Sequence, residues 1–322
     1  MQTVAAPARS YLQSLQERVL VFDGAMGTSI QRFKLSAADF GGKTGCNDFL
    51  VLSKPEVVEE IHSGFLEAGA DVVETCTFQA TRRRLAEWGL GERAYELNFE
   101  AARLARRAAD RFGERFVAGA MGPTGMLPSS SDPGLSAITF EDLRQLYREQ
   151  AEALLAGGVD LLLLETAQDL LELKAALFGV RDALAGAGRS VPVQAQITLD
   201  VTGRMLLGTD VSGALATLEG LPCDVIGLNC STGPEHMREP IRYLCQHSTK
   251  PVSCIPNAGL PVNDGSGDAV YLMEPEPMAA ELRGFVAEFG VNVVGGCCGT
   301  TPEHIRAFVE ATKGLRPRSG AQ

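Results

Sequence analysis

The sequence lacks the long apolar run that a membrane-spanning helix needs. No stretch approaches roughly 18 consecutive apolar residues. Residues 1–18 contain Arg9, Gln13, Glu17 and Arg18 and no apolar core of the kind found in a secretory signal peptide. These absences predict a soluble protein that is not exported, and we expect it in the cytoplasm.

Positive charge is scarce relative to negative charge. The chain has 29 Lys and Arg residues against 40 Asp and Glu residues, which is a formal net charge of −11. Such a protein repels phosphate backbones and anionic lipid surfaces. We therefore expect neither nucleic acid nor a membrane as a partner.

Cysteine is too rare for a disulfide scaffold, with eight residues in a chain of 322. No two of them form the Cys-x-x-Cys pair that marks finger-type structural zinc sites. Since thiols stay reduced inside cells, we expect these cysteines to be free thiols or metal ligands.

What the sequence does contain is a regular alternation of apolar runs and helical segments. Eight runs rich in Val, Ile and Leu show little polar alternation, which is typical of parallel strands buried on both faces. They cover residues 19–25, 70–78, 116–122, 161–166, 192–199, 224–230, 251–258 and 291–298. Helical periodicity between them includes residues 55–68, 92–112, 140–156, 168–184 and 302–312.

This alternation predicts an α/β fold, a single-domain (β/α)8 TIM barrel over residues 1–314, with residues 1–17 as an extra N-terminal helix. Residues 315–322 are rich in Gly, Pro and polar side chains and are interpreted as a linker or disordered tail. A doubly wound open sheet is the alternative fold. The first strand runs into residues 22–27, FDGAMG, which lack the dinucleotide-binding fingerprint of that fold.

Reactive side chains gather where the predicted strands end, which is where a (β/α)8 barrel builds its active site. Cys230 ends the sixth strand, and Cys297 and Cys298 end the eighth within a glycine-rich turn. Three thiolates meeting at one rim suit zinc, and three protein ligands leave a fourth position open, as in catalytic zinc sites. The alternative is that these cysteines are buried thiols that only fill space.

Two further features of the rim suit an amino acid. Asp23 and Glu165 can bind a cationic group such as an ammonium, and the backbone N–H groups of residues 24–27 can hold a carboxylate. Asn257 ends the seventh strand, and its oxygen is a candidate fourth metal ligand. Salt-bridged rim carboxylates, an ordinary tight turn and a turn asparagine are the respective alternatives. The four histidines, His62, His236, His247 and His304, fall in or beside predicted helices and are not expected at the site.

The motifs at these strand ends resemble one protein family. They are residues 23–28 (DGAMGT), 74–78 (ETCTF), 227–230 (GLNC), 256–261 (PNAGLP) and 295–302 (GGCCGTTP). They resemble the homocysteine S-methyltransferase family, and most closely the homocysteine-binding module of its cobalamin-dependent methionine synthases. The resemblance runs from about residue 19 to residue 312.

The resemblance implies a (β/α)8 barrel in which Cys230, Cys297 and Cys298 bind a catalytic Zn²⁺ ion. The homocysteine thiol would complete the site, and Asn257 would occupy the fourth position when substrate is absent. The implied substrate-binding residues are Asp23, Gly24, Ala25, Met26, Glu165 and Asn229. Cys76 departs from the family pattern, which has asparagine at this position, so the adjoining wall of the pocket differs here.

The methyl donor is less constrained, because the chain contains no D-x-H-x-x-G cobalamin-binding motif. We expect methylcobalamin as donor, bound by another module, with cobalamin- and folate-binding modules of the same enzyme as partners. A stand-alone enzyme that uses S-methylmethionine or betaine is the alternative. A more distant alternative is a non-enzymatic zinc or thiol sensor, because vicinal cysteines also oxidise.

Overall fold

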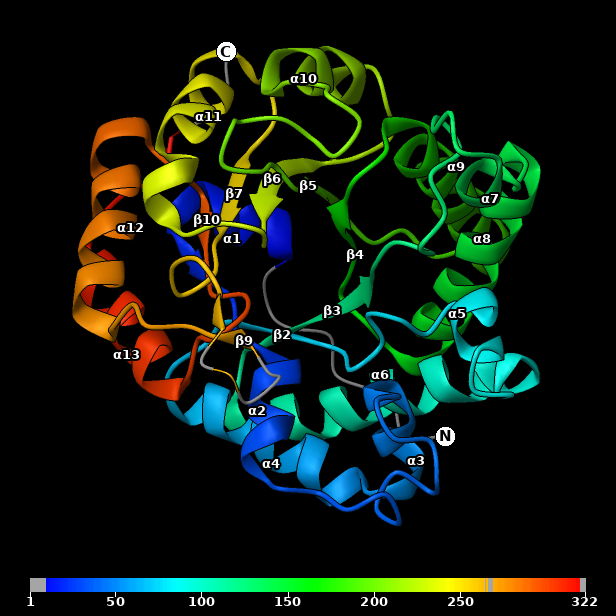
Figure 1. The fold of residues 1–322 in the computed structure, drawn as a ribbon. Helices are drawn as coiled ribbons and strands as arrows, with labels where there is room; N and C mark the ends of the chain where they lie inside the picture. Colours follow the sequence, from blue (N-terminus) through cyan, green and yellow to red (C-terminus); the bar gives the residue numbers. More distant parts are fainter. Residues whose placement is uncertain (1–9, 264, 266–268, 319–322) are drawn as a thin grey trace.

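The computed structural model describes residues 10–263, 265 and 269–318. Eight strands pair in parallel in the order β1-β10-β7-β6-β5-β4-β3-β2 and surround a central axis (Figure 1). They are β1 Leu20–Val21, β2 Val72–Glu74, β3 Phe116–Met121, β4 Leu161–Ala167, β5 Val193–Ile197, β6 Val225–Asn229, β7 Val252–Ile255 and β10 Val293–Val294. A separate two-stranded hairpin consists of β8 Val262–Asn263 and β9 Ala269–Val270.

The barrel closes where β1 meets β2. A parallel bridge joins Phe22 to Val72, and the Asp23 N–H donates to the Val72 carbonyl at 2.9 Å. The Asp71 N–H donates in turn to the Val21 carbonyl at 2.7 Å. The order of the strands together with this closure confirms the predicted single-domain (β/α)8 barrel, and an open doubly wound sheet was the wrong alternative.

Helices surround the strands, and all but α1 lie in an outer ring (Figure 1). They are α1 Tyr11–Glu17, α2 Met26–Arg32, α3 Leu50–Ser53, α4 Pro55–Glu67, α5 Arg82–Ala86, α6 Ala94–Ala109, α7 Pro133–Ser136, α8 Phe140–Gly157, α9 Leu170–Ala187, α10 Val211–Glu219, α11 Pro234–His247, α12 Pro275–Phe289 and α13 Pro302–Thr312, with 3-10 turns η1 Asn47–Phe49, η2 Gly91–Arg93 and η3 Asp110–Phe112. Within the described part of the chain, no helix has the length and apolar character needed to cross a membrane.

Helix α1 belongs to the barrel interior rather than to the outer ring. Tyr11 and Leu15 are buried in one apolar cluster with Phe22 and Phe116, and the Tyr11 hydroxyl donates to Gln194 Oε1 at 2.6 Å. The helix therefore fills the end of the barrel opposite the carboxyl ends of the strands. Residues 1–9 of the predicted N-terminal helix lie outside the described residues.

The C-terminal segment contacts the same end of the barrel. The Arg318 guanidinium donates to the carbonyls of Cys245, Ser248 and Lys250. The backbone N–H of Arg318 donates to the Gly290 carbonyl at 2.9 Å. Residues 315–318 thus lie against the domain. Residues 319–322, the rest of the segment interpreted as a linker or tail, lie outside the described residues.

One device recurs at the amino-terminal ends of alternate strands. An Asp or Asn directly precedes each of β2, β4, β6 and β10, and its side-chain oxygen accepts a hydrogen bond from a backbone N–H of the preceding strand of the barrel. In strand order, these residues are Asp71, Asp160, Asp224 and Asn292. The donors are Val21, Val117, Val193 and Val252, at 2.8–3.0 Å. Because an unpaired buried N–H is costly, these oxygens fix the register where each pair of strands begins.

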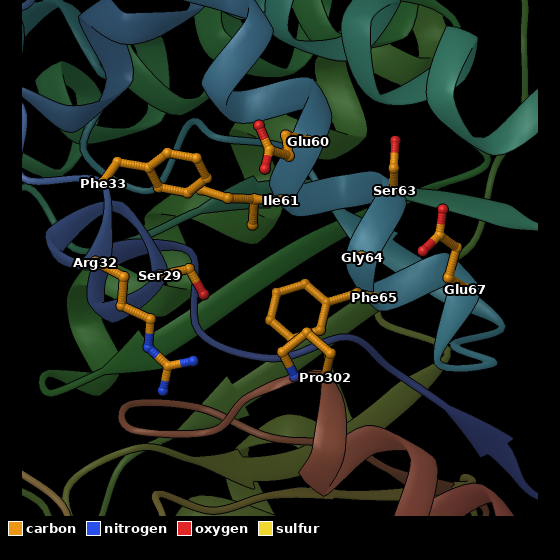
Figure 2. A pocket seen from close by; sticks show the side chains of 10 residues that line it. All are labelled: Ser29, Arg32, Phe33, Glu60, Ile61, Ser63, Gly64, Phe65, Glu67 and Pro302. Atoms are coloured by element: carbon orange, nitrogen blue, oxygen red, sulfur yellow. The ribbon is translucent and has the colours of Figure 1, made fainter.

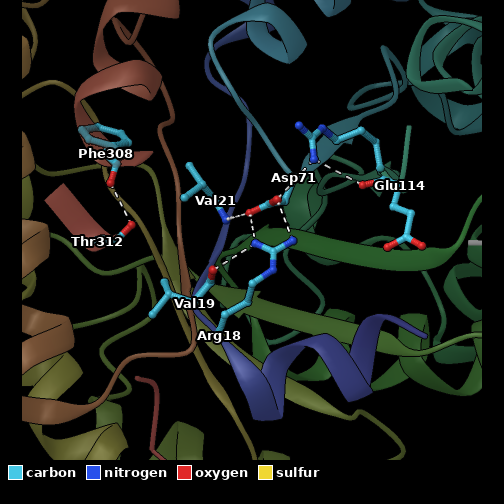
Figure 3. Close-up of polar contacts among 8 residues, drawn as sticks. Arg18, Val19, Val21, Asp71, Glu114, Phe308 and Thr312 are labelled. Carbon is cyan, nitrogen blue, oxygen red and sulfur yellow. Dashed lines mark hydrogen bonds and ion pairs between the residues drawn. The ribbon is translucent and has the colours of Figure 1, made fainter. Parts of the chain in front are cut away.

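Asp71 lies where β1 pairs with β2 and the barrel closes, and its carboxylate accepts hydrogen bonds from a side chain as well as from the backbone. Besides the Val21 N–H, it accepts two hydrogen bonds from the Arg18 guanidinium at 2.7 and 2.8 Å (Figure 3). Asp71 is 7% exposed, whereas the Arg18 side chain is 48% exposed. Loss of the carboxylate would leave a buried N–H unpaired, while Arg18 could rehydrate.

We predict that Asp71→Ala lowers the free energy of unfolding by about 2 kcal/mol, since it removes a buried acceptor and a paired charge. Urea denaturation of the full chain measures the change. Glu92→Ala is the control, because Glu92 makes a surface ion pair with Arg82 through a side chain that is 93% exposed. The control should change stability by less than about 0.5 kcal/mol, and an equal loss in both variants would contradict the prediction.

Candidate metal and substrate site

Three cysteine side chains converge at the carboxyl ends of the strands. Cys230 directly follows β6, and Cys297 and Cys298 lie just beyond β10. The three sulfur atoms lie within 4.8 Å of one another, and those of Cys230 and Cys298 are 3.9 Å apart. Sulfurs bound to one tetrahedral zinc ion at about 2.3 Å lie about 3.8 Å from each other, so the cluster could hold a metal ion.

Unusual backbone conformations aim the cysteines at one another. Cys230 and Ser231 have φ values of 60° and 64°, in the left-handed region that non-glycine residues rarely adopt. On the other side, a Cβ at Gly295 would lie 2.6 Å from the Phe22 Cβ, and one at Gly296 would lie 2.3 Å from Thr300 Oγ1. Only glycine therefore fits before the vicinal pair, as expected from the glycine-rich turn.

Polar side chains hold the turn that carries the vicinal cysteines. The Thr300 hydroxyl donates to the Cys297 carbonyl at 2.7 Å and accepts from the Ala25 N–H at 3.2 Å. Asn257 Oδ1 accepts from the Cys298 N–H at 3.0 Å, while the Asn257 N–H donates to the Thr232 carbonyl. Asn257 thus connects the two cysteine-bearing turns.

The protons of the cluster are shared unequally. Hydrogen bonds from the Cys230 and Cys297 thiols lower the pKa of Cys298 to about 3. The same interactions raise the pKa of Cys297 well above its ordinary value, because its proton is held between the neighbouring sulfurs. A sulfur that is ionised at neutral pH is what a soft metal ion requires of its first ligand.

Four carboxyl groups line the cavity beside the cysteines; one belongs to Asp48, and the other three lie at or just beyond strand ends. Asp23 follows β1, Glu74 ends β2, and Glu165 lies near the end of β4. Asp23 Oδ2 accepts from the Glu74 N–H at 3.1 Å, but Asp23 Oδ1 is buried without a partner. A buried carboxylate oxygen with no donor indicates a place for a cationic or donor group of a ligand.

A bulge in β4 turns Glu165 toward the cavity. The pairing of β4 with β5 shifts register between Leu164 and Ala167, and Thr166 has a φ of 57°. Asn229, at the end of β6, braces the bulge by accepting from the Thr166 N–H at 2.7 Å and donating to Glu165 Oε2 at 3.0 Å. Asn229 is therefore placed to orient Glu165.

Burial and mutual repulsion raise the pKa values of all three acids. Burial is the main cause for each, and repulsion from Glu165 adds to it for Asp23, from Asp23 for Glu74, and from Glu74 for Glu165. The cavity thus disfavours the charged forms of these acids, and among the described residues the protein itself supplies no cation to stabilise them. A cationic ligand would relieve this repulsion.

The turn that follows Asp23 offers backbone donors to the cavity. Helix α2 begins at Met26, and its N-cap residue Ala25 has no side chain to satisfy the N–H groups of the first turn. Only glycine fits at position 24, because a Cβ there would lie 2.7 Å from both the Phe65 ring and Thr300 Oγ1. With the carboxyls and the thiols, this turn lines a cavity of about 420 Å³.

A second cavity, of about 330 Å³, lies between α2, α4 and Pro302 (Figure 2). It is lined by Arg32, Glu60, Glu67 and aromatic rings, and it contains none of the predicted site residues. The cavity with the thiols is instead lined by five of the predicted residues, Asp23, Gly24, Ala25, Met26 and Glu165. Asn229 and Asn257 do not line it but hydrogen-bond to residues that do, Glu165 and Cys298. Their roles in binding stay predictions.

Several contributors to the site were not in the predicted set. Glu74 ends a strand but was not assigned a role, and Thr300 and Tyr271 contact the cysteine turn. Cys76, which departs from the family pattern, is buried at the wall of the cavity with its thiol toward the Asn47 carbonyl at 3.6 Å. Its position after a strand end was the available signal.

The family model for homocysteine S-methyltransferase matches residues 20–312, which is nearly the whole barrel. The chain belongs to the homocysteine S-methyltransferase family. Membership confirms the predicted resemblance and identifies the chain as a methyltransferase domain.

Similar sequences include two methionine synthases. That of Mycobacterium tuberculosis (strain ATCC 25618 / H37Rv) is 46% identical over 309 residues, covering 95% of this chain and 25% of the relative. That of Mycobacterium leprae (strain TN) is 45% identical over 319 residues, covering 97% of this chain and 26% of the relative. The chain therefore spans about a quarter of the length of these curated relatives.

Similar structures include the homocysteine methyltransferase MmuM from Escherichia coli. Its oxidized form is 25% identical with a TM-score of 0.74, and the match covers 95% of this chain and 99% of that one. Its metallated form has a TM-score of 0.73, with 92% and 98% covered. The barrel as a whole is therefore shared with MmuM.

We predict that Glu165→Gln stabilises the metal-free, ligand-free protein at pH 7. Burial raises the pKa of Glu165 in the folded protein above the value of 4.5 expected in the unfolded chain. Such a carboxyl lowers the free energy of unfolding as the pH rises above that unfolded-state pKa. The thermal midpoint of the variant should exceed that of the unaltered protein by about 2 °C or more at pH 7, with a smaller gap at pH 5.

Scanning calorimetry at both pH values measures the two gaps. Glu310→Gln is the matched control, because the Glu310 side chain is 69% exposed on α13. The control should leave the midpoint unchanged at both pH values. A lower midpoint for Glu165→Gln at pH 7 would show that the charge is compensated within the protein.

Proposed function

We propose that this domain transfers a methyl group to the thiol of homocysteine in a zinc-dependent reaction that yields methionine. The observation that carries the proposal is the convergence of three cysteine sulfurs, within 4.8 Å of one another, on a cavity that also presents buried acids and a helix N-terminus. A thiol-bearing amino acid matches all three features, because its sulfur, ammonium and carboxylate each meet a suitable partner.

Cys230, Cys297 and Cys298 would hold the Zn²⁺ ion. The sulfur-only donor set suits zinc, and the lowered pKa of Cys298 provides one thiolate before any metal arrives. When bound, the ion would supply a Lewis acid that keeps a substrate thiol deprotonated near neutral pH. We propose Asn257 as a neutral fourth ligand in the absence of substrate, because its Oδ1 keeps a lone pair beyond the one that accepts from Cys298.

The protein's own side chains would orient the substrate. Asp23 and Glu165 hold the ammonium, and Asn229 keeps Glu165 in place. The N–H groups at the start of α2 receive the carboxylate. With its ammonium and carboxylate fixed, the substrate points its sulfur to the cysteine cluster. The thiol proton passes to solvent before the transfer. The methyl–donor bond then breaks as the methyl–sulfur bond forms. No protein base is needed for the transfer itself.

We predict that Cys230→Ala abolishes both zinc binding and methionine formation while the fold is retained. Two remaining thiols leave too few protein ligands for tight zinc binding. Metal content of the purified protein, far-ultraviolet circular dichroism and methionine production are the measurements.

Cys245→Ala is the control, because Cys245 is half-buried on α11, outside the cysteine cluster. It should bind one zinc ion per chain and keep its activity. Full zinc content in Cys230→Ala would rule out the assignment of the ligands.

We propose further that the methyl donor is methylcobalamin, presented by another module of a longer cytoplasmic enzyme that also has a folate-binding module. Among the described residues, all ten exposed large apolar side chains come from segments that follow the carboxyl ends of strands. They are Phe78, Tyr95, Leu135, Leu171, Val201, Leu206, Leu207, Leu260, Val262 and Leu272. Phe78 lines the cavity with the cysteines, and exposed apolar side chains in the segments beyond the strand ends suit a protein-borne donor better than a freely diffusing one.

We predict that the zinc-loaded chain forms methionine from homocysteine with methylcobalamin, slowly because the carrier module is not attached. Parallel reactions with S-methylmethionine and betaine complete the test, and methionine is quantified by mass spectrometry. Turnover only with one of the small onium donors would replace the proposal with that of a stand-alone enzyme.

A further inference from the structure

The second cavity, between α2, α4 and the first residue of α13, has the size and lining of a small-molecule site. Its volume of about 330 Å³ lies within the range of roughly 300–1,000 Å³ that is typical of such sites. Its uncharged lining residues are Ser29, Phe33, Ile61, Ser63, Gly64, Phe65 and Pro302. Aromatic and aliphatic groups with a few hydroxyls suit the apolar body of a small ligand.

Three charged side chains at this cavity have no hydrogen-bonding or ion-paired partner among the residues that the structure describes. Arg32 ends α2, whereas Glu60 and Glu67 lie on α4. In Figure 2 the Arg32 guanidinium and the Glu67 carboxylate lie on opposite sides of the Phe65 ring. Arg32 also lowers the pKa of Glu303, but from beyond ion-pair distance. The cavity therefore presents one cation and two carboxylates that a ligand can pair.

This combination of charges favours a zwitterion. A simple anion would meet Arg32 but be repelled by two carboxylates, and a simple cation would be repelled by Arg32. A ligand with a carboxylate for Arg32, an ammonium for Glu60 or Glu67 and an apolar body for the rings would pair every part of the cavity. An apolar α-amino acid has these three parts, and the proposed reaction releases one of them, methionine.

Phe65 connects this cavity to the substrate cavity. It lines the second cavity, whereas Gly24 lines the substrate cavity. A Cβ built on Gly24 would lie 2.7 Å from Phe65 Cε1 and 2.7 Å from Thr300 Oγ1, so no space separates the ring from this turn. The Thr300 hydroxyl in turn holds the Cys297 carbonyl. Because packed groups transmit strain, an occupant that displaces the Phe65 ring would move the turn after β1.

Helix α2 is a second connection, because its residues are divided between the two cavities. Met26 and Thr28 line the substrate cavity, whereas Ser29 and Arg32 line the second one. Thr28 Oγ1 also accepts from the Gly299 N–H, in the cysteine turn, at 3.2 Å. A ligand that pulls on Arg32 would therefore shift residues that face the substrate.

We propose that the second cavity is a regulatory site for an apolar α-amino acid, and that its occupant weakens homocysteine binding through Phe65 and α2. The binding site itself is independent of the proposed function, whereas its effect on homocysteine rests on that function. Methionine, as the product, would then slow its own formation.

Calorimetric titration of the zinc-loaded full chain with homocysteine, at several fixed concentrations of norleucine, tests the proposal. Norleucine keeps the zwitterion and the apolar chain of methionine but has no sulfur to bind zinc. The dissociation constant of homocysteine should rise about fivefold or more and then level off, because two separate sites are coupled by a limited free energy. Competition within the substrate cavity would instead raise it without limit and would overturn the proposal.

Variants of two cations on neighbouring positions locate the norleucine site. In Arg32→Gln, the norleucine concentration that gives half of the effect should rise about tenfold or more, because a charge-assisted hydrogen bond is lost. Lys34→Gln is the matched control, since Lys34 has the same charge but does not line the cavity, and it should behave as the unaltered chain. Equal norleucine effects in Arg32→Gln and the unaltered chain would overturn the proposal.

Two further titrations separate this proposal from the proposed function. Hexanoate has the carboxylate and the apolar chain but no ammonium, and an effect equal to that of norleucine would overturn the zwitterion site. If homocysteine fails to bind the zinc-loaded chain, the proposed function is overturned. Direct titration of norleucine into the unaltered chain and Arg32→Gln then still decides the second site, and absence of binding to the unaltered chain would overturn it.

Discussion

Three sulfur atoms held within 4.8 Å of one another are the constraint on which the rest of the site depends. Thiolates at this distance would repel each other unless a proton or a metal ion lies between them, so the backbone supports must hold the sulfurs in place. The two cysteine turns follow β6 and β10, which are not neighbours in the sheet, because β7 lies between them. Asn257, just after β7, contacts both turns and joins them.

The site is built at a cost in stability that the barrel offsets. Left-handed backbone at Thr166, Cys230 and Ser231 costs of order 1 kcal/mol or more at each residue. The acids Asp23 and Glu165 add the cost of burying carboxyl groups and, to a smaller extent, repulsion from neighbouring acids. Such costs persist only where a rigid scaffold determines the conformation, and they leave binding groups that a ligand can satisfy.

The sequence was sufficient for the architecture and for the cysteines, because both depend on local patterns. Buried parallel strands are recognisable from apolar runs, and the carboxyl ends of such strands meet at one rim whatever the details of packing. Most predicted strands were nevertheless longer than the observed ones, as at β10, which spans only Val293–Val294, whereas β4 extends one residue beyond its predicted end. Beyond Val294 the chain leaves the sheet so that Cys297 and Cys298 can face the cavity.

Other parts of the site depend on contacts between residues distant in the chain, which no local pattern encodes. Asn229 braces the β4 bulge across 63 positions, and Thr300 joins the cysteine turn to Ala25 across 275 positions. The small hairpin of β8 and β9 and the placement of Tyr271 against Gly299 were missed for the same reason. The recurring Asp or Asn before alternate strands is visible in the sequence, but the backbone N–H group that each side chain binds is known only from the pairing of the strands.

The two ends of the barrel divide stability from function. At the amino-terminal end, α1 fills the interior, Asp71 and its counterparts pair the strand N–H groups, and Asn292 donates to the carbonyls of Leu15 and Arg318. The carboxyl end instead leaves Asp23 Oδ1 unpaired and its apolar rim uncovered. Transfer of a methyl group to a thiolate favours a site from which water is excluded. Under the proposed function, a donor-bearing module that covers the exposed apolar side chains beyond the strand ends would supply that exclusion, and the substrate would pair the groups left unsatisfied in the cavity.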